Sequence, residues 1–182
     1  PEILGPYFLE NFKEIINKDS VREGSYQVIA GGDAYGSGSS REAAVVAHMG
    51  GGIELVVAKS FQRIFQENMV YSGLPFTSDF DVLDRLKAGE EIDPQDLYAA
   101  LPAFFSAVAS MGGLLPYGTQ LLAGKVKPTY ETEASSRPMN CVEKIIAQNV
   151  WCGNEKPRGI GAVRPGEQVL CDTGFRGMHE YT

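Results

Sequence analysis

Short apolar runs alternate with helix-like segments in the first part of the chain. Residues 26–30 (Tyr-Gln-Val-Ile-Ala) and 53–58 (Ile-Glu-Leu-Val-Val-Ala) are apolar runs next to glycines, a pattern typical of buried strands. Between them, residues 42–49 are spaced as a helix, and three glycines at 50–52 are predicted to close it. The pattern therefore predicts a strand, a glycine-rich loop, a helix and a second strand.

A second helix is predicted after the second strand. Ser60 stands in the position of an N-cap for a helix over residues 61–71, and Gly73-Leu-Pro75 is predicted to end that helix. Strands that alternate with helices favour an α/β layered fold, in which the glycine-rich loop follows the carboxyl end of a strand. Ligands of such sheets usually bind at that end.

The chain then becomes apolar and loses its charges. No charged residue lies between Asp96 and Lys125, a stretch long enough to raise the question of a membrane span. Prolines and glycines interrupt it, which favours two short buried helices instead, at Pro102, Gly112, Gly113, Pro116 and Gly118. Asp93 and Pro94 are predicted to begin the first helix of this region.

The last third of the chain has the pattern of a new domain. Residues 129–137 are polar and predict an exposed linker, and residues 138–147 predict an amphipathic helix. Residues 161–170 then have the form of a turn followed by a strand. A domain boundary is therefore predicted at the linker.

The loop after the first strand carries the clearest chemistry. In Tyr35-Gly-Ser-Gly-Ser-Ser-Arg-Glu42, the two glycines permit unusual backbone conformations, and Ser39 or Ser40 is placed to cap the following helix. Free amides at a helix start favour an anion, and the fork of Arg41 suits a carboxylate. The plainer alternative is that the serines only cap the helix and that Arg41 makes a surface ion pair. His48, on the apolar face of that helix, is predicted to be a packed structural residue.

Composition narrows the function classes only slightly. The 182 residues are 43% hydrophobic and 21% charged, which is ordinary for a globular protein. A formal net charge of −7 argues against general nucleic-acid binding. We expect no membrane association, and a cytoplasmic location, because nothing resembles a signal peptide.

Cysteine spacing argues against a metal cluster held by this chain. Cys141, Cys152 and Cys171 are widely spaced and form no C-x-x-C pair, so they do not resemble the ligand set of an iron–sulfur cluster. The odd number argues against a disulfide framework. We therefore expect reduced thiols and no metal site in this chain.

Three ordered motifs give the chain a family resemblance. Residues 35–42, residues 57–64 with Asn68, and Gly73-Leu-Pro75 together resemble the swivel domain of the aconitase and isopropylmalate isomerase superfamily. This resemblance implies a hydro-lyase that dehydrates and rehydrates a hydroxy di- or tricarboxylate, with a [4Fe-4S] cluster whose ligands lie outside this chain. It also implies that Ser39 is the catalytic base, with Ser40 and Arg41 as substrate contacts. One departure is Ala43, where many relatives carry histidine.

The resemblance extends to domain order. Residues 1–96 are predicted to be a swivel domain that lacks a recognisable first part, and residues 97–127 a helical linker. Residues 128–182 resemble the incomplete start of the superfamily's catalytic domain, where His179 is implied as a substrate contact. We therefore expect a fragment that is inactive alone and that needs the remainder of the catalytic domain as its partner.

Domain order also guides the substrate prediction. A swivel that precedes the catalytic domain favours aconitate hydratase, which converts citrate to isocitrate through cis-aconitate. The alternative in the same superfamily is 3-isopropylmalate or homoaconitate dehydratase. A second alternative is a non-catalytic anion-binding regulatory module that kept the loop but lost the chemistry.

Overall fold

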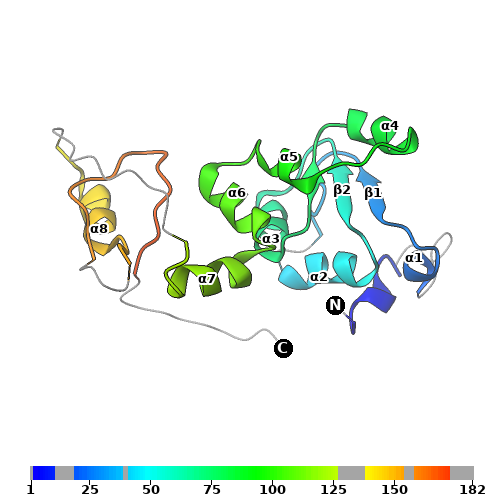
Figure 1. Cartoon of the computed structure of the whole chain (residues 1–182), viewed down its shortest axis with the longest axis horizontal. Coiled ribbons are helices and arrows are strands. Elements are labelled where there is room, and N and C mark those ends of the chain that lie inside the picture. The colour runs from blue at the N-terminus through cyan, green and yellow to red at the C-terminus, as the bar shows by residue number, and fades with distance from the viewer. Residues whose placement is uncertain (1, 11–18, 39–40, 127–137, 154–157, 173–182) are drawn as a thin grey trace. The chain divides into compact units, whose positions relative to one another are not determined.

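The computed structural model describes residues 2–10, 19–38, 41–126, 138–153 and 158–172. The chain divides into two compact units, residues 1–117 and residues 118–182 (Figure 1). The predicted domain boundaries at residues 96 and 127 remain predictions.

A small parallel sheet lies at the centre of the first unit. Its three strands are β1 (Val28–Gly31), β2 (Leu55–Ala58) and β3 (Phe76–Thr77), in the spatial order β1-β2-β3. Helix α2 (Glu42–Gly50) connects the first two strands, and α3 (Arg63–Ser72) connects the last two. Parallel strands joined through helices confirm the predicted α/β class.

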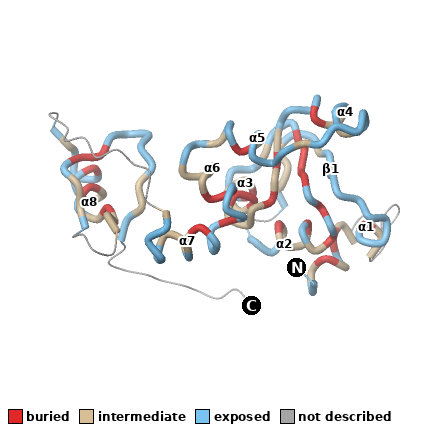
Figure 2. Tube along the Cα trace, in the orientation of Figure 1, coloured by how far each residue is buried: buried red, intermediate tan, exposed pale blue. Residues whose placement is uncertain are grey.

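Strand β2 is buried on both faces, as expected for the central strand of a covered parallel sheet (Figure 2). Leu55 and Val57 form a cluster with Val82 of α4 (Asp81–Lys87). Because side chains alternate along a strand, Val56 and Ala58 point to the opposite face, and both have no exposed surface. The apolar run seen in the sequence is therefore the core of this unit.

The uncharged region folds as short helices, as predicted. They are α5 (Pro94–Tyr98), α6 (Ala103–Ser110) and α7 (Leu114–Leu122). The Asp93 carboxylate caps α5 by accepting a hydrogen bond from the Gln95 amide at 2.9 Å. The sequence predicted that Pro116 interrupts this region, but Pro116 lies inside α7. It is the third residue of that helix, where the backbone needs no intrahelical N–H bond. Among the described residues, no helix is long and apolar enough to cross a membrane.

Helix α6 packs against α3 and α5 within the first unit. The rings of Tyr71 and Phe105 meet edge to face, with centroids 6.1 Å apart. The end of α3 is closed by Gly73 with a φ of 72°, so the predicted stop at Gly73 is confirmed. Near the amino terminus, η1 (Gly5–Tyr7) packs on α2 and on α1 (Ser20–Glu23).

The second unit is built around α8 (Cys141–Asn149). This helix begins three residues later than predicted because Asn140 is its N-cap. The Asn140 side chain accepts from the Glu143 amide at 2.9 Å, and the Glu143 carboxylate accepts from the Asn140 amide at 2.8 Å. Ala147 of α8 packs with Val150 and Val163 in a small buried core.

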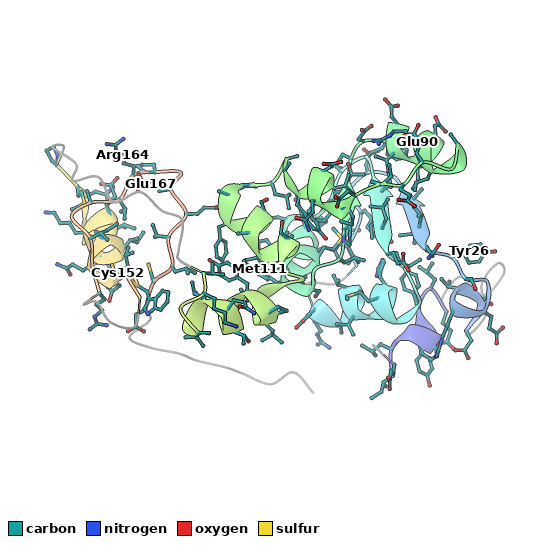
Figure 3. The ribbon with its side chains drawn as sticks, viewed as in Figure 1. Tyr26, Glu90, Met111, Cys152, Arg164 and Glu167 are labelled. Carbon is teal, nitrogen blue, oxygen red and sulfur yellow. The ribbon has the colours of Figure 1, made fainter. Side chains whose placement is uncertain are left out.

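The strand predicted over residues 161–170 is wrong for the residues that the structure describes. Only the turn forms: the Glu167 amide donates to the Arg164 carbonyl at 3.1 Å, and the Arg164 amide donates to the Glu167 carboxylate at 2.7 Å (Figure 3). A single antiparallel bridge joins Val150 to Cys171. Without a partner strand to pair with, the apolar residues of this segment pack on α8 instead. The predicted linker at 129–137 lies outside the described residues.

Candidate functional site

The loop predicted to bind a carboxylate follows the carboxyl end of β1. Gly31, the last residue of β1, pairs with Ala58, the last residue of β2, so the segments after both strands leave the sheet at the same edge. The described loop residues Ser37, Gly38 and Arg41 are exposed. The loop is therefore placed where ligands of parallel α/β sheets usually bind.

Hydrogen bonds to the segment after β2 fix the start of this loop. The Ala34 amide donates to the Ser60 hydroxyl at 2.8 Å, and the Tyr35 amide donates to the Ser60 carbonyl at 2.9 Å. The Gln62 amide donates back to the Tyr35 carbonyl at 2.9 Å. The prediction that Ser60 caps α3 is therefore wrong, because its hydroxyl holds the loop and the N-cap position of α3 falls on Gln62.

One of the two loop glycines is required by the backbone. Gly36 has a φ of 85°, and a β-carbon at this position would overlap the ring of Phe65. Gly38 has no left-handed φ, and a β-carbon there would meet no atom within 4 Å. The conformational freedom predicted for both glycines is thus used at Gly36.

Tyr35 and His48 form a half-buried pair behind the loop. The Tyr35 hydroxyl lies 2.8 Å from Nε2 of His48, and Nδ1 of His48 lies 2.7 Å from the Ala44 carbonyl. A carbonyl can only accept, so Nδ1 carries the proton and Nε2 accepts from Tyr35. The Phe8 and Phe65 rings lie 4.3 and 5.4 Å from the imidazole, centroid to centroid. His48 is 7% exposed, which confirms the prediction that it is a packed residue.

Burial shifts the pKa of both members of this pair. It lowers the pKa of His48, an effect that the hydrogen bond to Ala44 partly opposes. It raises the pKa of Tyr35 to about 12. Both groups are therefore neutral at pH 7, as their hydrogen bond requires.

Arg41 is the predicted site residue whose position is described. It is exposed and extended, with φ −87° and ψ 143°, and it occupies the N-cap position of α2. The prediction that Ser39 or Ser40 caps α2 is wrong, because the N-cap position of α2 falls on Arg41, the residue after the two serines. Ser39, Ser40 and His179 lie outside the described residues.

A second cation at the same edge was not predicted. Lys59 directly follows β2 and is exposed. Lys59 could have been found by its position directly after a buried strand that runs parallel to β1. Two cations, Arg41 and Lys59, thus belong to the segments after neighbouring strands and favour an anionic ligand there.

The described residues do not fit a resident metal cluster. They contain no group of three or more His, Cys, Asp or Glu side chains placed to hold a metal ion. The thiol of Cys152 lies 3.6 Å from the Val150 carbonyl and 3.5 Å from the Gly159 carbonyl, within its own unit.

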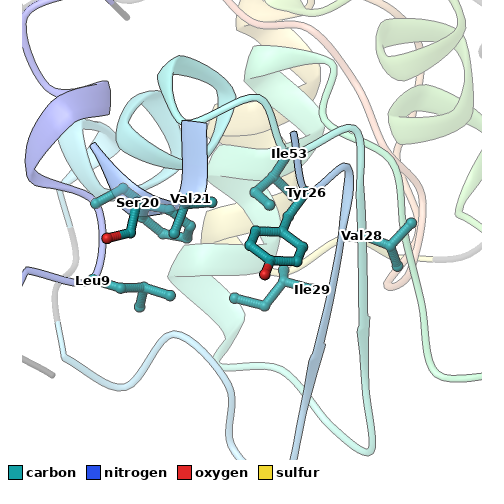
Figure 4. Close-up of a pocket in the computed structure, with 8 residues that line it drawn as sticks. Leu9, Ser20, Val21, Tyr26, Val28, Ile29 and Ile53 are labelled. Atoms are coloured by element: carbon teal, nitrogen blue, oxygen red, sulfur yellow. The ribbon is translucent and has the colours of Figure 1, made fainter. Parts of the chain in front are cut away.

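A separate cavity of about 330 Å³ lies at the other end of β1 (Figure 4). The described residues that line it are mainly apolar: Phe8, Leu9, Ser20, Val21, Tyr26, Val28, Ile29 and Ile53. None of these described side chains offers a positive charge to a carboxylate.

Part of the chain matches a known protein family. The family described as Aconitase C-terminal domain matches residues 10–78. A 3-isopropylmalate dehydratase small subunit from Pyrobaculum islandicum is 37% identical over 93 residues, which cover 51% of this chain and 55% of that protein. The chain thus spans about half the length of this relative.

A longer match decides the family. The 3-isopropylmalate dehydratase small subunit of Caldicellulosiruptor saccharolyticus is 32% identical over 133 residues, covering 64% of this chain and 74% of that protein. The chain belongs to the aconitase and isopropylmalate isomerase superfamily. A crystal structure of 3-isopropylmalate dehydratase from Methanocaldococcus jannaschii, another superfamily member, is 27% identical and superposes with a TM-score of 0.43, covering 64% of this chain and 74% of that one.

These relatives correct the predicted substrate branch. The main prediction, aconitate hydratase, is wrong, because the relatives from Pyrobaculum islandicum and Caldicellulosiruptor saccharolyticus are both named 3-isopropylmalate dehydratase small subunits. The aconitate hydratase prediction rested on the order of the predicted domains. Domain order carries no information about the side chains that contact a substrate, so it could not separate the two branches.

Proposed function

We propose that this chain is the swivel part of a 3-isopropylmalate dehydratase. It would present a hydroxy dicarboxylate to a larger catalytic part for dehydration and rehydration. The observation that carries the proposal is the 32% identity to a 3-isopropylmalate dehydratase small subunit over 74% of that protein's length. The exposed loop at the carboxyl edge of β1 and β2 supports it.

The charges at this edge suit the substrate class. The Arg41 guanidinium can hold one carboxylate through two parallel hydrogen bonds, and Lys59 adds a second positive charge from the end of β2. A dicarboxylate offers two anionic groups to these two cations.

Ser39 is proposed as the base that removes a carbon-bound proton, and Ser40 as a substrate contact. A serine hydroxyl is a weak base, so its alkoxide needs stabilisation by amides, a helix start and cations. The loop precedes the amino terminus of α2 and carries Arg41, which are groups of this kind. His179, which belongs to the second unit, is proposed as a further substrate contact.

The superfamily implies a [4Fe-4S] cluster in the complete enzyme. The described residues do not fit such a cluster, so we propose that its ligands come from the larger catalytic part. The second unit is proposed to be the start of that part, and the chain by itself is proposed to be inactive.

The proposal is tested by hydration of 2-isopropylmaleate. The chain is assayed as part of its complete protein, reconstituted anaerobically with iron and sulfide, beside the Ser39→Ala variant and with cis-aconitate as the competing substrate. We expect turnover of 2-isopropylmaleate that is lost in the variant. Turnover of cis-aconitate alone, or equal turnover by the variant, would contradict the proposal.

A binding assay separates the enzyme from an anion-binding module. The Ser39→Ala variant should still bind an isopropylmalate analogue with near-normal affinity, because Arg41 is intact. A complete protein that binds the analogue and carries its cluster, yet turns over neither substrate, would instead support the non-catalytic module.

A further inference from the structure

A chain of hydrogen bonds runs behind the loop from its first residue to its last. The Tyr35 hydroxyl donates to Nε2 of His48 at 2.8 Å, and Nδ1 of His48 donates to the Ala44 carbonyl at 2.7 Å. The Ala44 amide in turn donates to the Arg41 carbonyl at 3.2 Å. Four groups thus join the two ends of the segment that would hold the anion.

The directions of these bonds agree along the whole chain. Every donor points from Tyr35 towards Arg41, and the bonds on the two sides of the His48 imidazole polarise one another through the ring. This order depends on one tautomer of His48, with the proton on Nδ1, and the Ala44 carbonyl enforces that tautomer. A residue that only filled space at position 48 would not require either bond.

The surroundings make the pair stiff. His48 is 7% exposed, and the aromatic rings of Phe8 and Phe65 lie on it. Tyr35 is also held through its backbone, whose amide and carbonyl bond to Ser60 and Gln62. The two anchors are therefore fixed to the segment after β2 and to α2, while Ser37, Gly38 and Arg41 are exposed.

We infer that Tyr35 and His48 are positioning residues that hold Arg41, together with the described loop residues Ser37 and Gly38, in the conformation for substrate binding. This inference rests on the proposed function for its consequence in turnover, but its structural part is testable without any activity. Neither residue touches the substrate in this role. They act by fixing both ends of the loop.

The first test measures local opening by limited proteolysis of the full chain. Trypsin can cut after Arg41, at the end of the loop, and after Lys87, an exposed residue at the end of α4. Tyr35→Phe removes one hydrogen bond from a half-buried pair, so we expect cleavage after Arg41 to rise about tenfold. Cleavage after Lys87 should stay within about twofold, because that site belongs to a different surface.

Two further variants make the test specific. Tyr98→Phe is the matched control, because the Tyr98 hydroxyl also makes a part-buried hydrogen bond, to the Gly73 carbonyl at 3.4 Å, away from the loop. It should leave the ratio of the two cleavage rates unchanged. His48→Gln keeps an acceptor for Tyr35 and should restore most of the protection that His48→Leu removes.

A spectroscopic test addresses the tautomer directly. The chain has two histidines, so the imidazole nitrogens of His48 can be assigned in a ¹⁵N spectrum by comparison with His48→Gln. We expect the proton on Nδ1 in the native chain and also in Tyr35→Phe, because the Ala44 carbonyl that accepts this proton is unchanged. A proton on Nε2 in the native chain would overturn the inference.

Turnover then separates this inference from the proposed function. In the complete reconstituted protein, Tyr35→Phe should lower kcat/KM for 2-isopropylmaleate about tenfold, and Tyr98→Phe should leave it within about twofold. If proteolysis and tautomer behave as expected but the native protein has no activity, the proposed function fails and the positioning pair stands. If Tyr35→Phe raises cleavage equally at both sites, the pair only stabilises the fold and the inference fails.

Discussion

Gly36 lies against Phe65 so closely that a β-carbon on the loop residue would overlap the ring carbons of the helix residue. The contact joins the candidate anion loop to α3, the helix after β2. It explains why the loop carries a glycine at this position in terms of space as well as of backbone angle.

Replacement of this glycine should destabilise the first unit. Gly36→Ala combines a left-handed φ of 85° with overlap onto Phe65, and we expect a loss of about 2–4 kcal/mol in the free energy of unfolding. Urea titration followed by circular dichroism measures it. Gly38→Ala in the same loop is the control and should change stability by less than about 0.5 kcal/mol. Equal losses in both variants would show that the Phe65 contact is not responsible.

Acid should weaken the fold through His48. Burial lowers its folded-state pKa below the ordinary value of 6.5, so the unfolded chain takes up a proton at a higher pH than the folded chain does. Stability should therefore be unaffected by His48 above about pH 7 and should fall as the pH drops from about 6.5 through the lowered pKa, by at most about 1.4 kcal/mol per pH unit.

The His48→Gln variant isolates this effect from the carboxylates. Urea titrations of both proteins between pH 7.5 and pH 5 should show stabilities that diverge below about pH 6.5, with the native chain losing more. Parallel curves over that range would mean that His48 keeps its ordinary pKa in the folded state.

Arg41 should not tolerate replacement by lysine. Arg41→Lys keeps the charge but loses the two-point grip on a carboxylate, and we expect affinity for an isopropylmalate analogue to fall about tenfold. Titration calorimetry on the complete protein measures this. The control is Arg63→Lys, because the Arg63 side chain is 79% exposed and pairs with Glu67 on its own helix. A similar loss in both variants would point to general charge effects.

The second unit should depend on its helix cap. Asn140→Ala removes the acceptor for the Glu143 amide and should cost about 1 kcal/mol, whereas Asn140→Asp keeps an acceptor and should cost less than about half of that. The chain has one tryptophan, Trp151, which lies in this unit and whose amide bonds to the Leu170 carbonyl at 2.8 Å. Its fluorescence during urea unfolding reports this unit. An unchanged transition in Asn140→Ala would show that the cap contributes nothing.

Local patterns predicted strands β1 and β2 and helices α2, α3 and α5, but not β3 or α4. The apolar runs at β1 and β2, the glycines that end α2 and α3, and the Asp93 cap of α5 each depend on neighbours in the sequence. The role of Ser60 was missed because its partner, Ala34, lies 26 residues away. In the sequence, a serine that caps α3 and a serine that bonds to the loop look alike. The parallel bridge between Tyr35 and Phe61 places Ser60 beside the loop.

The sequence placed the candidate loop after the carboxyl end of β1, whereas the roles of its residues stay predictions. Glycines and Arg41 marked the loop, because few residue types fit such a turn. The bond between Tyr35 and His48 and the position of Lys59 appear only once the strands are paired. The substrate branch required relatives, because the motif of the loop does not contain the residues that distinguish one hydroxy acid from another.

Strand β1 stands at the edge of the sheet, and its carboxyl end leads into the candidate loop. Among the described residues, β1 pairs only with β2, so the candidate loop begins at the margin of the sheet and not at its buried centre. Arg41 and Lys59 follow an outer and a central strand, and a ligand that contacts both would bridge the ends of two strands.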